Sequence, residues 1–225
     1  MPARDKKEAL GSSLPAEMAR ASTRAADVYF SADVETDGPI PGPYSILSFA
    51  LVYAGRFDGN CFERPGEPKL TFYRELKPIS ELFDPEALRV NGLDRGKLVQ
   101  IGQAPEQAMS DACRWVKQIA KSDRAVLVAY PLSFDWSWLY WYFIRFSTDR
   151  SPFGHSRCFD IKSAVAIKEH IPIGEAGRSQ LPPALRSHHS HSHNALDDAI
   201  EQAEIFAKVF ELGDSNGRGP GSTPS

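Results

Sequence analysis

Three carboxylates, Asp33, Glu35 and Asp37, fall within five positions directly after the apolar residues 28–30. Residues two apart on a β-strand point to the same face, so a strand that reaches this far projects Asp33 and Glu35 together. Two carboxylates held side by side under partial burial repel each other and lose hydration, and a bound divalent cation offsets both costs. The spacing favours a metal site at a strand end over the alternative, a polar strand end that leads into a Pro/Gly turn.

An EF-hand calcium loop has a similar opening, which here would run from Asp33 through Glu35 and Asp37 to Gly38. That loop requires a bidentate glutamate at its twelfth position, which is Tyr44 in this chain, and it follows a helix. The residues before Asp33 have a strand pattern instead. The EF-hand interpretation is therefore excluded on both counts.

A second acidic residue, Asp135, stands in an aromatic segment at 133–147, shortly after an apolar run at 124–130. An acid in the first turn of a helix has a sufficient structural role, because it favours the helix dipole and can cap free amides. The aromatic neighbours nevertheless predict apolar surroundings for this carboxylate; they are Phe134, Trp136, Trp138 and Trp141.

The third acidic cluster is the sequence HNALDD at 193–198, at the start of a segment with helical periodicity. Projected on a helix, Asp197 shares a face with charged residues, whereas Asp198 lies in line with apolar residues and is expected to face the protein. Asn194 is the predicted N-cap, which gives Asp197 a capping or helix-dipole role. His193 directly precedes this helix, and this position distinguishes it from the other histidines of the loop 187–193. Those histidines are interpreted as solvent-exposed residues without a specific role.

Apolar runs bounded by turn residues predict five strands, and segments of helical periodicity predict three helices. The first three strands are joined by short Gly/Pro-rich connections, which suits an antiparallel meander. Helices and strands then alternate, so the expected fold is α/β, with a mixed sheet flanked by helices. The strands are expected at 27–34, 45–54, 69–75, 124–130 and 157–161, and the helices at 105–121, 133–147 and 194–211.

The length of 225 residues suits one well-buried domain, expected at 26–212. Both ends, 1–25 and 213–225, lack a sustained apolar period and are predicted to be disordered tails. No apolar core follows a basic start, no run approaches the length of a membrane span, and the three widely spaced cysteines suit reduced thiols. We therefore expect a soluble, cytoplasmic protein without a membrane partner.

Taken together, the motifs resemble the DEDDh exonuclease superfamily, in its RNase T-like group. The resemblance rests on DVET, which contains Asp33 and Glu35, on SFDW, which contains Asp135, and on HNALDD, in which four residues separate His193 from Asp198. Each motif is short, but their order, spacing and predicted elements agree across the chain. The resemblance implies an RNase H-like fold with helices on both sides of the sheet, and a 3'-to-5' exonuclease of the DEDDh type.

The resemblance also implies a role for each site residue. Four carboxylates without a cysteine ligand favour two Mg²⁺ or Mn²⁺ ions. Asp33 would bridge both ions, while Glu35 and Asp198 would complete the site of the attacking water. Asp135 would help to hold the second ion. His193 would take the proton from the water, which suits the near-neutral titration of histidine side chains.

The substrate implied by the RNase T-like group is the 3' end of single-stranded RNA, which would release nucleoside 5'-monophosphates. Two alternatives remain, a DNA 3'-5' exonuclease and a non-catalytic nucleic-acid-binding module on the same fold. The complete set of acids argues against the module, because a pure binder has no need of concentrated negative charge where phosphate must lie. Relatives of this kind are often dimers, so a homodimer is a further expectation.

Candidate contacts to nucleic acid are Thr36, Phe134, Trp138 and Arg178. Phe134 and the tryptophans of 133–147 are able to stack on terminal bases, although core packing is the favoured interpretation of Trp138. The net charge of −3 argues against binding through bulk positive charge. The stretch 150–192 is locally basic, and it is predicted to contact the phosphate backbone, with a solvated surface as the alternative.

Overall fold

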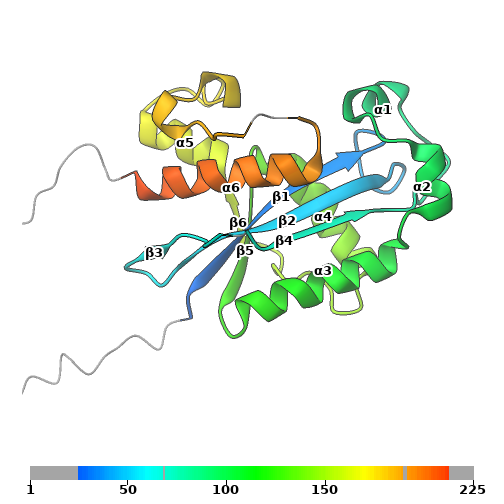
Figure 1. Ribbon diagram of the computed structural model, residues 1–225, viewed down its shortest axis with the longest axis horizontal. Coiled ribbons are helices and arrows are strands. Elements are labelled where there is room, and N and C mark those ends of the chain that lie inside the picture. The colour runs from blue at the N-terminus through cyan, green and yellow to red at the C-terminus, as the bar shows by residue number, and fades with distance from the viewer. Residues whose placement is uncertain (1–24, 68, 190–191, 213–225) are drawn as a thin grey trace, which may run out of the picture.

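The computed structural model describes residues 25–67, 69–189 and 192–212. The two predicted tails therefore lie outside the described residues, apart from residue 25. A mixed sheet forms the centre of the described part, and helices cover both of its faces (Figure 1). The α/β class and the RNase H-like arrangement that the resemblance implied are confirmed.

The sheet has six strands: β1 (Asp27–Thr36), β2 (Ile46–Phe57), β3 (Phe62–Glu63), β4 (Thr71–Glu75), β5 (Arg124–Ala129) and β6 (Cys158–Asp160). β2 pairs antiparallel with β1, β3 and β4, which confirms the predicted meander of the first three long strands. β5 pairs parallel with β1 and with β6. β1 is thus central, and the ends of β1 and β5 lie at the same edge of the sheet.

The helices are α1 (Pro85–Asn91), α2 (Arg95–Ile101), α3 (Pro105–Ala120), α4 (Leu132–Phe146), α5 (Ile161–Glu169) and α6 (Ala195–Glu211). The three predicted helices correspond to α3, α4 and α6. The pattern of apolar residues did not predict α1, α2 and α5. α1 buries none of its residues and α2 buries one, so they depend on caps from Asp84 and Asp94 rather than on an apolar face.

Two apolar clusters divide between the faces of the sheet. Phe30, Ala32 and Val34 of β1 join α3 and α4 in one cluster, whereas Tyr29 joins α5 and α6 in the other. Because side chains alternate along a strand, Asp33 and Glu35 share the Tyr29 face, which α6 covers. Among the described helices, none combines the length with the apolar character that crossing a bilayer requires.

Candidate active site

The end of β1 and the start of α4 bring the first three predicted acids together. Asp33, Glu35 and Asp135 are all buried, and the three side chains line one cleft of about 640 Å³. The backbone N–H of Val34 donates a hydrogen bond of 3.1 Å to Oδ1 of Asp135. This bond ties the first turn of α4 to β1, so Asp135 occupies a fixed place beside the carboxylates of the strand.

The start of α6 places the remaining two predicted residues, Asp198 and His193. The Asn194 side chain caps the helix, as predicted. Asp198 is fully buried, and its two oxygens accept hydrogen bonds from the backbone N–H groups of Ser192, at 2.8 Å, and His193, at 3.1 Å. Asp197 is exposed. The predicted phase of the helix is therefore confirmed.

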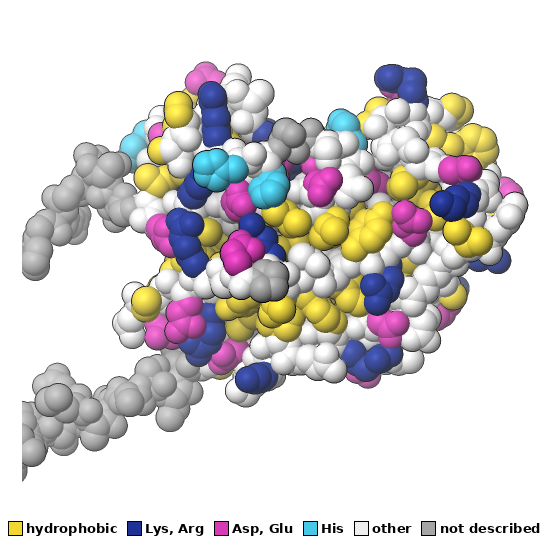
Figure 2. All heavy atoms as spheres, viewed as in Figure 1, with side chains coloured by type: hydrophobic (Ala, Val, Ile, Leu, Met, Phe, Trp, Pro, Cys, Tyr) yellow, Lys and Arg dark blue, Asp and Glu magenta, His cyan; other side chains and the backbone are white. Residues whose placement is uncertain are grey.

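His193 lies at the mouth of the same cleft, exposed and with a left-handed φ of 55°. This conformation is uncommon for a residue with a side chain, and the hydrogen bond from its N–H to Asp198 helps to hold it. Potential ligand atoms of Glu35, His193 and Asp198 all lie within 4.8 Å of one another. Figure 2 shows histidine side chains beside acidic side chains over α6. The structure thus brings all five predicted residues to one place.

Burial and mutual repulsion raise the pKa of three of the carboxylates, Asp33, Glu35 and Asp135. Burial raises the pKa of Glu35 to about 8, and the charges of Asp198 and Asp135 add to this effect. Burial also raises the pKa of Asp135 to about 7. The pKa of Asp33 lies well above its ordinary value, first through burial and then through its acidic neighbours. Several buried carboxylates thus face the guanidinium of Arg178, which opposes this rise in pKa without cancelling it. A buried group of oxygen ligands with an excess of acidic charge fits a hard divalent cation.

Metal-free protein is expected to lose thermal stability as the pH rises from about 5 to about 8.5. Glu35 has an ordinary pKa of 4.5 and a folded pKa of about 8, so the folded chain binds the extra proton. The resulting stabilisation is complete below 4.5 and is lost as the pH rises through 8. Since one pKa unit corresponds to about 1.4 kcal/mol, thermal unfolding in EDTA should resolve the change.

Two comparisons test this pH dependence. Glu35→Gln removes one of the titrating groups and should flatten the slope of Tm against pH. Saturating Mg²⁺ should reverse the slope, because the cation binds the folded chain with its carboxylates ionised. A Tm in EDTA that rises over this pH range would contradict the crowding of the carboxylates.

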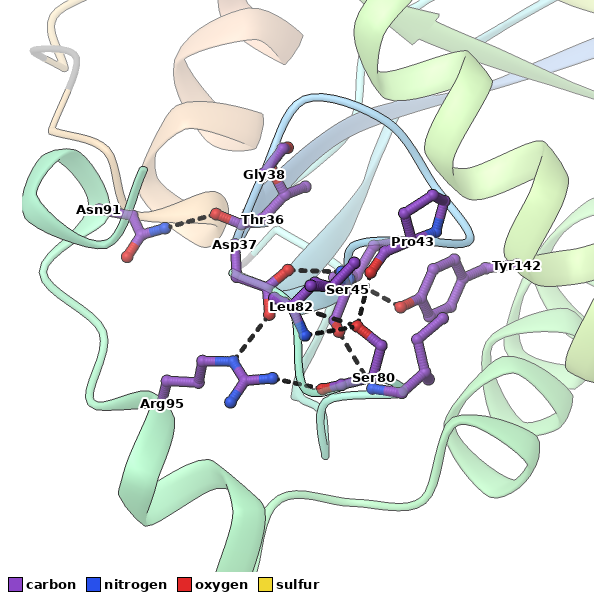
Figure 3. A network of polar contacts seen from close by, with 12 residues as sticks. Thr36, Asp37, Gly38, Pro43, Ser45, Ser80, Leu82, Asn91, Arg95 and Tyr142 are labelled. Atoms are coloured by element: carbon purple, nitrogen blue, oxygen red, sulfur yellow. Dashed lines mark hydrogen bonds and ion pairs between the residues drawn. The ribbon is translucent and has the colours of Figure 1, made fainter. Parts of the chain in front are cut away.

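The third carboxylate of the opening motif, Asp37, has a structural role. It is fully buried, and its Oδ2 accepts a hydrogen bond of 2.9 Å from Nε of Arg95 on α2 (Figure 3). Its Oδ1 accepts one of 2.5 Å from the backbone N–H of Ser45. Nearby, the Asn91 side chain donates to the backbone carbonyl of Thr36 at 2.9 Å. Asp37 and Asn91 thus connect α1, α2 and the turn after β1. Of these, α1 and the turn line the cleft.

Glu204 on α6 anchors the other end of the histidine-rich loop. It accepts hydrogen bonds from Oγ of Ser187, at 2.6 Å, and from Nζ of Lys69, at 2.9 Å. Although burial opposes ionisation, these two donors lower the pKa of Glu204 to about 2. The sequence around Glu204 does not indicate this contact with Ser187, where the loop that carries His193 begins.

The predicted nucleic-acid contacts divide into two groups. Thr36, Phe134 and Arg178 line the cleft, and Phe134 is 41% exposed. Trp138 is fully buried in the core cluster of α3 and α4, so its ring is closed to a base. The prediction that Trp138 contacts nucleic acid is therefore corrected, in favour of core packing.

The locally basic stretch 150–192 contributes less positive charge to the cleft than its composition indicates. Arg157, Lys168 and Arg186 donate hydrogen bonds to backbone carbonyls. Of the basic residues in this stretch, Lys162 and Arg178 line the cleft. Within this stretch, Lys162 and Arg178 are therefore the basic side chains that remain candidates for contact with the phosphate backbone.

Comparison with known proteins gives consistent results. The chain is 36% identical over 187 residues to the 3'-5' DNA exonuclease Cap18 of Escherichia coli, a match that covers 83% of this chain and 93% of that protein. It is 27% identical over 183 residues to Ribonuclease T of Baumannia cicadellinicola subsp. Homalodisca coagulata, a match that covers 79% and 80% of the two chains. No protein-family model matches.

The fold resembles the nuclease domain of 3'hExo, described as a DEDDh family member, with a TM-score of 0.60. That match covers 85% of this chain and 94% of the other at 13% identity, so it concerns the fold alone.

Proposed function

Because this chain belongs to the DEDDh superfamily of 3'-5' exonucleases, we propose that it removes nucleotides from the 3' end of single-stranded DNA with the help of divalent cations. The observation that carries the proposal is the convergence of Asp33, Glu35, Asp135, Asp198 and His193 at one cleft. A non-catalytic binding module would gain nothing from acids at this position, since they repel phosphate.

The choice of DNA reverses the order of preference that the sequence motifs favoured. They placed RNA first, through the RNase T-like group. The relative with 36% identity is a DNA exonuclease, whereas the relative named Ribonuclease T has 27% identity. The higher identity supports DNA as the main substrate, and RNA becomes the alternative outcome of the experiment.

The donor set fits Mg²⁺ or Mn²⁺. Two such ions held by Asp33, Glu35, Asp135 and Asp198 would neutralise charge on the scissile phosphate and lower the pKa of a bound water. The chain itself supplies the base. The imidazole of His193 lies within 4.8 Å of carboxylate oxygens of Glu35 and Asp198. In this proposal it takes the proton of the attacking water as the new P–O bond forms and the bond to the leaving 3' oxygen breaks. The product is a nucleoside 5'-monophosphate.

Two further side chains are suited to hold the substrate in the cleft. Phe134 exposes part of its ring there and is able to stack on the terminal base. The Lys162 ammonium, which has no ion-pair partner among the described residues, is suited to a backbone phosphate. Neither contact reads sequence, which suits an exonuclease that acts on successive nucleotides.

Single-stranded DNA labelled at its 5' end is expected to shorten progressively from the 3' end in Mg²⁺ or Mn²⁺, faster than RNA of the same sequence. Reaction products are separated by length, and the released nucleotides are identified as 5'-monophosphates. EDTA should stop the reaction, because the carboxylates alone cannot stabilise charge on the phosphate.

The outcomes separate the parts of the proposal. Faster degradation of RNA would overturn the DNA preference and leave the exonuclease intact. Binding without shortening under every metal would overturn the exonuclease. Shortening that starts at the 5' end would overturn the proposed 3'-to-5' direction. DNA labelled at its 3' end checks this direction, because a 3'-to-5' exonuclease releases that label first.

A further inference from the structure

Gln202 is a buried polar residue on the face of α6 that packs against the sheet. It lies one turn after Asp198 and is fully buried. Its buried neighbours on the helix, Ala199, Ala203 and Phe206, belong to an apolar cluster. The side-chain Nε2 of Gln202 donates a hydrogen bond of 2.8 Å to Oδ1 of Asp33. A core position that apolar residues surround is thus occupied by an amide that contacts the acidic cleft.

This amide is costly for the fold. Its Oε1 has no hydrogen-bond partner within the part of the chain that the structure describes. A buried acceptor without a partner destabilises the folded state, and an apolar side chain of similar size removes that cost. Fold stability alone therefore does not explain a glutamine at this position, whereas the contact with Asp33 does.

A positive charge also lies near the same oxygen of Asp33. Nη2 of Arg178 lies 4.0 Å from Oδ1 and donates to the backbone carbonyl of Tyr130 at 2.8 Å, and Nη1 contacts Glu201 at 3.2 Å. Gln202 and Arg178 thus act on one oxygen of the carboxylate.

We propose that Gln202 is a positioning residue, which orients the Asp33 carboxylate for divalent cations by holding its Oδ1. This inference rests on the proposed function, because it assumes that Asp33 is a metal ligand. Groups that hydrogen-bond to a metal ligand commonly set its orientation and the affinity of the site. Gln202 acts on the ion only through Asp33, so it contributes to metal affinity and has no contact with substrate.

Gln202→Met tests the proposal, because it removes both the donor and the orphan acceptor at similar side-chain length. Mn²⁺ affinity is measured without nucleic acid, by electron paramagnetic resonance or calorimetry, and Tm is measured in EDTA. Mn²⁺ affinity is expected to fall about 10- to 100-fold. Tm in EDTA is expected to stay unchanged or to rise, since the unpaired acceptor is gone. A residue with a merely structural role would show the opposite pattern.

Ile205→Met is the matched control, a methionine at another buried position of the same helix. It should leave Mn²⁺ affinity unchanged. If Gln202→Met does not fold, Gln202→Asn replaces it, because the shorter amide loses its reach to Asp33 and the same loss of affinity is expected. Wild-type Mn²⁺ affinity in the folded Gln202 variant, or an equal loss in Ile205→Met, overturns the proposal. Failure of wild-type protein to bind Mn²⁺ and to degrade DNA overturns the proposed function itself.

Discussion

Replacing Asp33 by Asn is expected to lower the exonuclease rate by about 10³-fold or more while the fold is retained. The carboxylate is the proposed bridge between the two ions, and loss of about 4 kcal/mol of transition-state stabilisation corresponds to this factor. The fold tolerates the change because burial already raises the pKa of Asp33, so a neutral side chain removes a cost. The Asn oxygen can still accept the hydrogen bond that Gln202 donates to Asp33. Single-turnover rates on DNA and Tm in EDTA check both parts.

Asp27→Asn is the matched control for this experiment. Asp27 begins the same strand, outside the residues that line the cleft, and pairs with Arg124 at 2.8 Å. Both partners are partly exposed, so their interaction contributes little stability. The control variant should keep the wild-type rate. Retention of more than about a tenth of the rate in Asp33→Asn would contradict its place in the metal site.

The parts of the site that sequence could predict are those governed by a local period. The strand period places Asp33 and Glu35 on one face, and the helix period separates buried Asp198 from exposed Asp197. The structure confirms both placements. The helices α3, α4 and α6 were predictable for the same reason, because each buries a face with a regular apolar repeat. The strands β1, β2 and β5 were predictable as short apolar runs, which the sheet buries almost throughout.

The parts that sequence could not predict depend on contacts between distant residues. The Gln202 amide meets Asp33 across 169 positions, and Arg95 meets Asp37 across 58. Neither member of these pairs indicates its partner through its neighbours in the chain. The helices α1 and α2 escaped prediction because caps rather than an apolar stripe support them. Trp138 shows the converse case. An aromatic side chain near a proposed metal ligand belongs either to the core or to a binding surface, and only its burial decides between the two.

Replacing Asp198 by Asn is expected to lower the rate by at least as much as replacing Asp33, because Asp198 has two roles. Its carboxylate is a proposed metal ligand, and its two oxygens hold the backbone N–H groups of Ser192 and His193. An amide keeps only one acceptor oxygen, so the backbone N–H of either Ser192 or His193 loses its hydrogen bond to this side chain, which loosens the segment that carries the His193 imidazole. The variant should therefore lose about 10³-fold in rate, and Mn²⁺ affinity as well.

Asp197→Asn separates these roles from the general effect of removing an acid near a helix N-terminus. Asp197 is exposed in the first turn of α6, so its loss should cost about 0.3–1 kcal/mol of stability through the helix dipole. Its exonuclease rate should stay within about threefold of wild type, since that cost lies in folding rather than in the transition state. Equal losses in the two variants would show that the helix start as a whole, and not the buried carboxylate, supports catalysis. A loss confined to Asp198→Asn, together with weaker Mn²⁺ binding, is the result that the geometry of the cleft requires.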